Sequence, residues 1–254
     1  MKALLSIAYY TLLQNMRHKI FLISIGAGTF LIIFSILAGE MAVGEQTRFI
    51  LDFSMAITQV LSLFLAIIIG SYQTREEIDK GTVSLIITKP ISRSLYLLGK
   101  FSGGALSVLF NILCMGVLSL AVFYFQKVPI SIPYMLSLYL IFIESLIVLA
   151  FAMFFSLISS SIIATMATFG TTIIGHFSRD FFLLSQKGHG LARIFGKTSY
   201  ILLPNLEKFN IKTMVIYSTS PSLYYMLMVT LYALFFMTMV MVLNKIILDK
   251  LDIQ

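Results

Sequence analysis

Long apolar runs dominate the chain and determine what it can fold into. They cover residues 20–38, 53–72, 101–125, 134–177 and 222–243, and a single carboxylate, Glu144, interrupts the fourth. A helix rises about 1.5 Å per residue and a bilayer core is roughly 30 Å thick, so each run is long enough to cross a membrane. The pattern predicts membrane-spanning helices.

The run 134–177 is too long for one span, because as a single helix it would extend about 66 Å. The three serines at 159–161 form a polar break within it, and we expect a tight turn there. The predicted fold is all-α: a single transmembrane domain over residues 1–254 with both termini on one side. Its six transmembrane helices are expected at 20–38, 53–72, 101–125, 134–158, 161–177 and 222–243.

Composition excludes a soluble protein. Hydrophobic residues make up 59% of the chain and charged residues 11%, whereas soluble domains carry about 25% charged residues. The net charge of +7 comes from Lys and Arg at the ends of apolar runs, where lipid headgroups attract them. No basic cluster interleaves with aromatic residues on a polar face, so we expect membrane lipids and no nucleic acid as partners.

Basic residues predict the orientation, because positively charged short loops stay in the cytoplasm. Lys and Arg are frequent in the N-terminal segment and in the connection 73–100, which places both segments and both termini in the cytoplasm. The connection 178–221 is also basic, yet six spans place it outside. Long loops follow the rule less strictly.

Residues 1–19 have the pattern of an amphipathic helix lying in the membrane interface. Polar Ser6, Gln14, Arg17 and His18 fall on the face opposite to the apolar one. An N-terminal extension of the first span is the alternative. The apolar face consists of Leu4, Leu5, Ala8, Leu12 and Met16.

The connection 73–100 reads as a compact cytoplasmic elbow. Glu76 and Lys80 are spaced for a helical i,i+4 pair, and Pro90 stops the chain before a second helix. Ser92 or Ser94 can cap that helix, which continues into the third span. Without further information, a solvated loop whose charges only fix topology is the alternative.

Several motifs in this elbow resemble the cytoplasmic coupling segment of the ABC type-2 permease family. They are Glu76-Glu77, Gly81-Thr82, Lys89-Pro90-Ile91-Ser92-Arg93 and Leu98-Gly99-Lys100. The run Leu203-Pro204-Asn205-Leu206-Glu207 before the last span adds to the resemblance, as does the polar break after the fourth. Span order agrees over nearly the whole chain, while the motifs cover about thirty positions.

The resemblance implies a six-span permease in a prokaryotic plasma membrane, the cell inner membrane. Two copies of a separate ABC ATP-binding subunit would bind ATP and Mg, and a second permease copy would complete a homodimer or a paralogue heterodimer. The elbow would form a coupling helix that docks on the ATPase through exposed charges. The implied coupling residues are Arg75, Glu76, Glu77, Asp79, Lys80, Gly81, Thr82, Lys89, Pro90, Ser92 and Arg93.

Gly196-Lys197-Thr198 ends like a Walker A loop but does not form one. The required spacing puts a glycine at position 191, which is Leu191. No strand precedes the motif to aim backbone amides at a phosphate. We therefore expect no enzyme activity and no cofactor in this chain.

Three further features suggest intramembrane roles. Glu144 is costly in lipid and should face protein or water; it either contacts substrate or gates a path, or it is hydrogen-bonded to a neighbouring helix, with Asn111 as the candidate partner. His176 lacks companion ligands for a metal, so an interfacial histidine is favoured. Gly99 and Gly103 form a small-xxx-small pair that permits close helix packing.

The extracytoplasmic connection 178–221 contains the apolar stretches 181–184 and 191–195, flanked by basic residues. They suit short helices that dip into the outer interface, as in the family, and a further extracytoplasmic partner could dock there. A disordered loop is the alternative, although it would leave aromatic and Leu side chains exposed.

The leading functional prediction is the permease subunit of an ATP-driven exporter that works by alternating access. A non-transporting membrane subunit that relays ATPase motion to an extracytoplasmic partner is the first alternative. An ion-coupled secondary carrier is the second, but such carriers tend to have several midplane ionisable residues, whereas only Glu144 qualifies here.

Overall fold

The computed structural model describes residues 2–41, 44–73, 75–76, 92–187 and 203–250. These residues form helices and short connections and no β-strand, which confirms the all-α prediction. The chain begins with α1 (Lys2–Arg17), followed by α2 (Lys19–Glu40). The backbone of His18 between them is extended, with φ −73° and ψ 134°, so α1 is a separate helix and not a straight extension of α2.

Five of the described helices are long and apolar enough to cross a membrane. Besides α2 they are α3 (Gln46–Ile68), which continues into the π-helix η1 (Ile69–Gln73), α6 (Arg93–Phe125), α7 (Ile132–Ile158) and α11 (Leu223–Lys250). The helix α8 (Ser161–Lys187) is not among them, because several Thr, Gly and charged residues lower its hydropathy.

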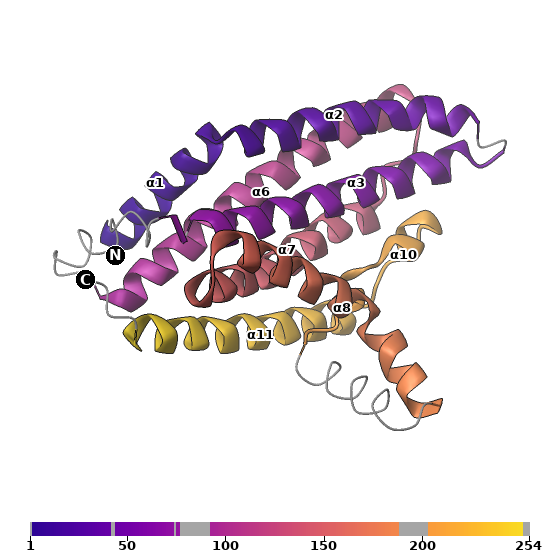
Figure 1. Cartoon of the computed structure of the whole chain (residues 1–254). Helices are drawn as coiled ribbons and strands as arrows, with labels where there is room; N and C mark the ends of the chain where they lie inside the picture. Colours follow the sequence, from indigo (N-terminus) through magenta and orange to yellow (C-terminus); the bar gives the residue numbers. More distant parts are fainter. Residues whose placement is uncertain (1, 42–43, 74, 77–91, 188–202, 251–254) are drawn as a thin grey trace.

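The long helices lie side by side in one bundle (Figure 1). The starts of α1 and α6 and the end of α11 lie at one end of the bundle, called here the termini end; the opposite end is called the far end. α7 and α8 form an antiparallel hairpin whose turn contains Ser159 and Ser160. The helix break therefore occurs at the serines that the sequence singled out.

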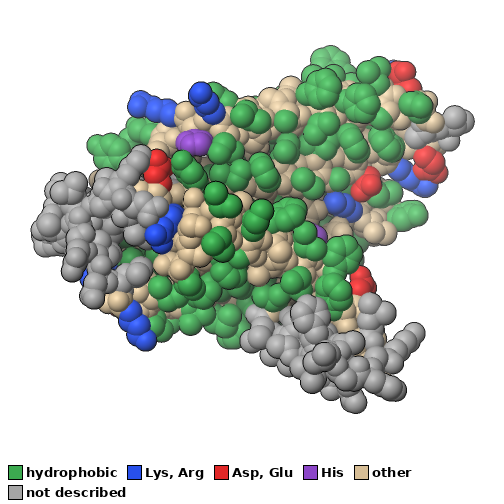
Figure 2. All heavy atoms as spheres, in the orientation of Figure 1, with side chains coloured by type: hydrophobic (Ala, Val, Ile, Leu, Met, Phe, Trp, Pro, Cys, Tyr) green, Lys and Arg blue, Asp and Glu red, His purple; other side chains and the backbone are tan. Residues whose placement is uncertain are grey.

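α7 is the central helix. In its most apolar stretch 72% of the residues are buried, against 28% for α2 and 33% for α11. The peripheral helices expose large apolar side chains such as Phe30 and Phe235. Hydrophobic side chains cover the middle of the face shown in Figure 2, and charged side chains gather toward its ends. This surface suits a lipid solvent.

Residues 203–216 pack into the far end of the bundle. They form the short helices η2 (Leu206–Phe209) and α10 (Lys212–Ile216). Leu206, Phe209 and Val215 are almost fully buried and belong to the same core as residues of α3 and α7. Apolar side chains therefore hold this connection against the bundle.

The four positions within residues 1–19 that were predicted to be polar are all exposed, and the most buried residues of α1 lie toward one edge of the predicted apolar face. Of the five predicted apolar positions only Ala8 is buried, and Leu5 is 61% exposed. Thr11 and Asn15 are buried instead, because α1 packs on α6. The contact with α6, more than the hydrophobicity of each side chain, therefore decides which residues of α1 are buried.

Candidate functional site

The predicted coupling segment is described at its two flanks. Arg75 and Glu76 follow η1, and Ser92 and Arg93 begin α6. Glu77, Asp79, Lys80, Gly81, Thr82, Lys89 and Pro90 lie outside the described residues. The geometry of the flanks decides how motion of this segment would reach the bundle.

Ser92 is the N-cap of α6. Its backbone is extended, with φ −68° and ψ 145°, and its Oγ accepts a hydrogen bond from the backbone N–H of Leu95 at 3.3 Å. Such a bond satisfies one of the N–H groups that a helix start leaves without a partner. Of the two serines that could have capped the helix, the structure uses Ser92.

The start of α6 is joined to the end of α11. The guanidinium of Arg93 donates a hydrogen bond to the backbone oxygen of Leu248, where a cation also complements the helix dipole. Beside this bond, Tyr96 and Leu97 of α6 are buried in a small cluster with Leu248 and with Met153 and Leu157 of α7. This cluster connects α6, α7 and α11 at the termini end.

Small residues on α6 allow α1 to approach closely. A Cβ built at Gly99 would lie 2.7 Å from Cγ2 of Ile7, and one at Gly103 would lie 2.5 Å from Cβ of Thr11 and 2.7 Å from the backbone oxygen of Ala8. No Cβ tolerates such distances without a shift. The predicted close packing at the Gly99 and Gly103 pair is confirmed.

The other flank is equally close to the core. η1 is a π-helix, a rare conformation that is frequent at functional sites. A Cβ at Gly70 would lie 2.5 Å from Cβ of Ala152 and 3.0 Å from the backbone oxygen of Leu149. Both flanks of the coupling segment therefore pack on the same part of α7. The sequence contains no signal for this shared contact.

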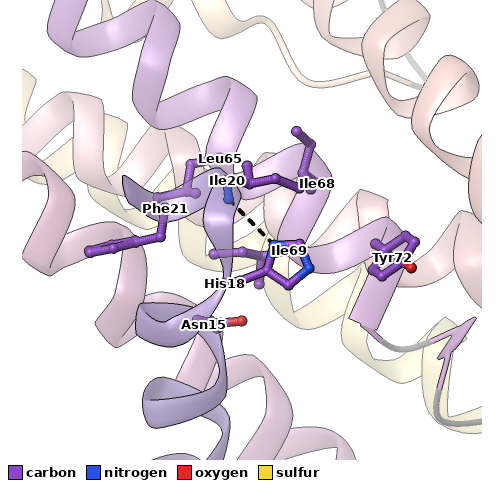
Figure 3. Close-up of a pocket in the computed structure, with 8 residues that line it drawn as sticks. All are labelled: Asn15, His18, Ile20, Phe21, Leu65, Ile68, Ile69 and Tyr72. Carbon is purple, nitrogen blue, oxygen red and sulfur yellow. Dashed lines mark hydrogen bonds between the residues drawn. The ribbon is translucent and has the colours of Figure 1, made fainter. Parts of the chain in front are cut away.

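A small cavity of about 20 Å³ lies where α1, α2 and η1 meet (Figure 3). Asn15, Phe21 and Leu65 line it together with His18 and Tyr72, whose ring centroids are 5.9 Å apart. Space of this size holds one water molecule when polar partners are present. The break between α1 and α2 thus borders the π-helix that leads into the coupling segment.

A polar cluster lies inside the bundle around Glu144, which is completely buried. Nε2 of Gln59 on α3 donates a hydrogen bond of 2.8 Å to its Oε2, and Nε2 of His176 on α8 lies 3.3 Å from its Oε1. The cluster joins α3, α7 and α8.

The expected pairing of Glu144 with Asn111 is wrong. Asn111 accepts a hydrogen bond from Ser24 at 3.1 Å and donates one to Ser62 at 3.3 Å, because α6 turns this residue toward α2 and α3. Gln59 takes its place beside Glu144. The only sequence signal for Gln59 is that an amide inside an apolar span needs a partner.

No group of three or more His, Cys, Asp or Glu side chains that could hold a metal occurs in the part of the chain that the structure describes. Beside His176 lies the carboxyl group of Glu144, with Nε2 of His176 3.3 Å from Oε1.

Comparison with known protein families identifies the kind of membrane protein that has this fold. A family model described as "ABC-2 family transporter protein" matches residues 10–201. A search of curated proteins found no match. The family consists of multi-pass membrane permeases that work with an ATP-binding subunit. Because the match covers most of the chain, from α1 through the coupling segment to beyond α8, the chain belongs to the ABC-2 transporter family and is a membrane permease subunit.

Proposed function

We propose that the chain is the membrane permease of an ATP-driven exporter and that its partner ATPase acts on it through residues 75–93. One observation carries the proposal: both flanks of this segment pack on α7 through glycine and aromatic contacts, at Gly70 and at Tyr96. A displacement of the segment cannot be absorbed locally by packing this close. It moves the core helices instead.

In this proposal α6 acts as a lever that transmits the displacement to the other helices. Its 33 residues extend about 50 Å, longer than the hydrocarbon core of roughly 30 Å. The excess lies at the termini end, where α1 covers Gly99 and Gly103 and Arg93 reaches α11. ATP-driven closure of the partner would push the start of α6 and so rearrange the spans between inward-open and outward-open states.

We also infer that α8 is the sixth span. It lies beside α7, and its hydroxyls are bonded to its own backbone: Thr165 to the oxygen of Ser161, and Thr168 to that of Ala164. Internal bonding of this kind lets a polar helix enter lipid. With six spans both termini and the coupling segment share one side, and the basic residues at the termini end favour the cytoplasm.

We infer that the cluster of Glu144, Gln59 and His176 acts as a gate that opens toward the far end. The cluster holds α8 against α3 and α7, and its groups are too polar to separate into lipid. Opening toward the far end would exchange these contacts for water or substrate. Because side chains fill the single bundle, we place the substrate path between two copies of the permease.

A second function is a relay without transport. The folded 203–216 connection, with Leu206 and Phe209 buried, would offer an extracytoplasmic partner a defined surface. In that case ATP-driven motion would pass through the same coupling segment. Transport of a substrate by the reconstituted complex distinguishes the two functions.

Copurification with the ATPase tests the proposal. Exchanging the charges at the coupling flank, Arg75→Glu with Glu76→Arg, should abolish recovery of an ATP-binding subunit from detergent extracts. The matched control exchanges Glu45 and Arg48, an exposed ion pair of 2.8 Å at the far end, and should leave recovery unchanged. Equal loss in both variants, or retention in the first, would contradict docking at this segment.

A further inference from the structure

An open cavity of about 560 Å³ lies at the far end, away from the coupling segment. It is framed by the last turns of α8, by η2 and by the start of α11. Arg179, Phe182, Asn205, Glu207, Lys208 and Tyr225 line it. Its volume falls within the range of roughly 300–1,000 Å³ that is usual for small-molecule sites.

Tyrosines fix the polar groups of this cavity. The backbone N–H of Asn205 donates to Oη of Tyr232 at 2.7 Å, and Tyr225 donates to the backbone oxygen of Lys208 at 2.6 Å. Nζ of Lys208 lies 4.2 Å from the centre of the Tyr232 ring, a cation–π contact. The site is therefore built before any ligand arrives.

The charged side chains that line the cavity favour a ligand that carries both a negative and a positive group. Arg179 offers a planar fork that fits phosphate oxygens, and Lys208 adds a second positive charge. Glu207 carries a negative charge, already oriented by a bond from Asn210 at 3.0 Å. A group with a phosphate and a protonated amine would satisfy both the cations and the carboxylate.

The apolar surroundings indicate where the rest of the ligand lies. Leu183, which is 48% exposed, and Phe182 of α8 both line the cavity. Acyl chains would cover these side chains. We propose that this cavity binds the headgroup of a phospholipid that carries a phosphate and a primary amine, as phosphatidylethanolamine does; the site goes beyond the coupling function and does not depend on it.

The absence of tryptophan from the chain allows a direct test. Phe182→Trp places a single fluorophore at the cavity, and Leu234→Trp, at a lipid-exposed position of α11, reports general lipid contact. Each protein is placed in phosphatidylcholine nanodiscs with a small fraction of brominated phosphatidylethanolamine or of phosphatidylcholine with the same brominated chains. We expect the fluorescence of the Phe182→Trp protein to be quenched at roughly tenfold lower mole fraction of the ethanolamine lipid. The fluorescence of the Leu234→Trp protein should show no headgroup preference.

Substitutions of the charged residues that line the cavity show whether the headgroup preference depends on these residues or on a change in the fold. Arg179→Gln and Glu207→Gln, each in the Phe182→Trp background, should remove the headgroup preference. In the Leu234→Trp background the same two substitutions should leave both the quenching and the elution volume unchanged. Equal quenching of the Phe182→Trp protein by both lipids, or a preference that survives both variants, would overturn the proposal.

A soluble competitor distinguishes the lipid from its headgroup alone. Glycerophosphoethanolamine should not relieve the quenching of the Phe182→Trp protein, because acyl chains contribute to binding. Relief would assign the site to the free phosphoamine and overturn the lipid proposal. Loss of ATPase recovery plays no part in these outcomes, so the site and the coupling function are tested separately.

Discussion

The guanidinium of Arg93, the first residue of α6, donates a hydrogen bond to the backbone oxygen of Leu248 near the end of α11. The two residues are far apart in the chain, and the bond joins the coupling segment to the last helix of the bundle. A permease that is driven from one short segment needs such contacts, because a flexible attachment would dissipate the displacement.

Replacing Arg93 by Gln should loosen this attachment. The bond is partly buried and charge-assisted, so we expect a loss of about 1–2 kcal/mol in the stability of the termini end and reduced ATPase stimulation. Hydrogen exchange of the last turns of α11 measures it. Arg48→Gln is the control, because that side chain is exposed and its ion pair with Glu45 lies at the far end. Equal exchange in the two variants would refute the role of Arg93.

Ser92 and Ser94 provide a second matched pair. Ser92→Ala removes the cap of α6 and should cost about 1 kcal/mol, seen as a lower midpoint of thermal unfolding in detergent. Ser94→Ala should change the midpoint very little, since the cap bond to Leu95 comes from Ser92. Comparable losses in both variants would show that the cap geometry is incorrect.

Gln59 and Glu144 should be energetically coupled. A double-mutant cycle with Gln59→Leu and Glu144→Leu is expected to give a coupling of about 0.6–1.7 kcal/mol, between the average and the largest values for interhelical hydrogen bonds in membrane proteins. Steric trapping or thermal unfolding in micelles supplies the four stabilities. The same cycle between Asn111 and Glu144 should give no coupling, because Asn111 bonds to Ser24 and Ser62; a large value there would contradict the observed pairing.

Hydropathy alone marks five of the long helices as spans, so the sequence predicts these well, whereas α8 is too polar to be marked in the same way. The break at Ser159 and Ser160 was also readable, as was the close packing at Gly99 and Gly103. Contacts between spans were not readable. His176 meets Glu144 only because α7 and α8 run antiparallel from that break in one register, and a single sequence contains no information on the rotation of each helix.

The residues of α1 that contact α6 were not readable from the sequence for a related reason. Counting hydrophobic residues favoured Leu5, yet the contact with α6 uses Ala8 and Thr11, which are small enough to approach the glycines. In a membrane protein close packing outweighs hydrophobicity as a guide to helix contacts, since lipid is as apolar as the core.

ATP hydrolysis by the assembled complex tests most directly whether the coupling segment drives the bundle through α6. Gly103→Leu would force α1 away from α6, whereas Gly26→Leu enters open space on α2, where a Cβ meets nothing within 4 Å. We expect both variants to retain the ATP-binding subunit. Gly26→Leu should keep permease-stimulated hydrolysis, and Gly103→Leu should lose most of it. Full stimulation in the Gly103→Leu complex would show that the contact between α1 and α6 does not transmit the motion.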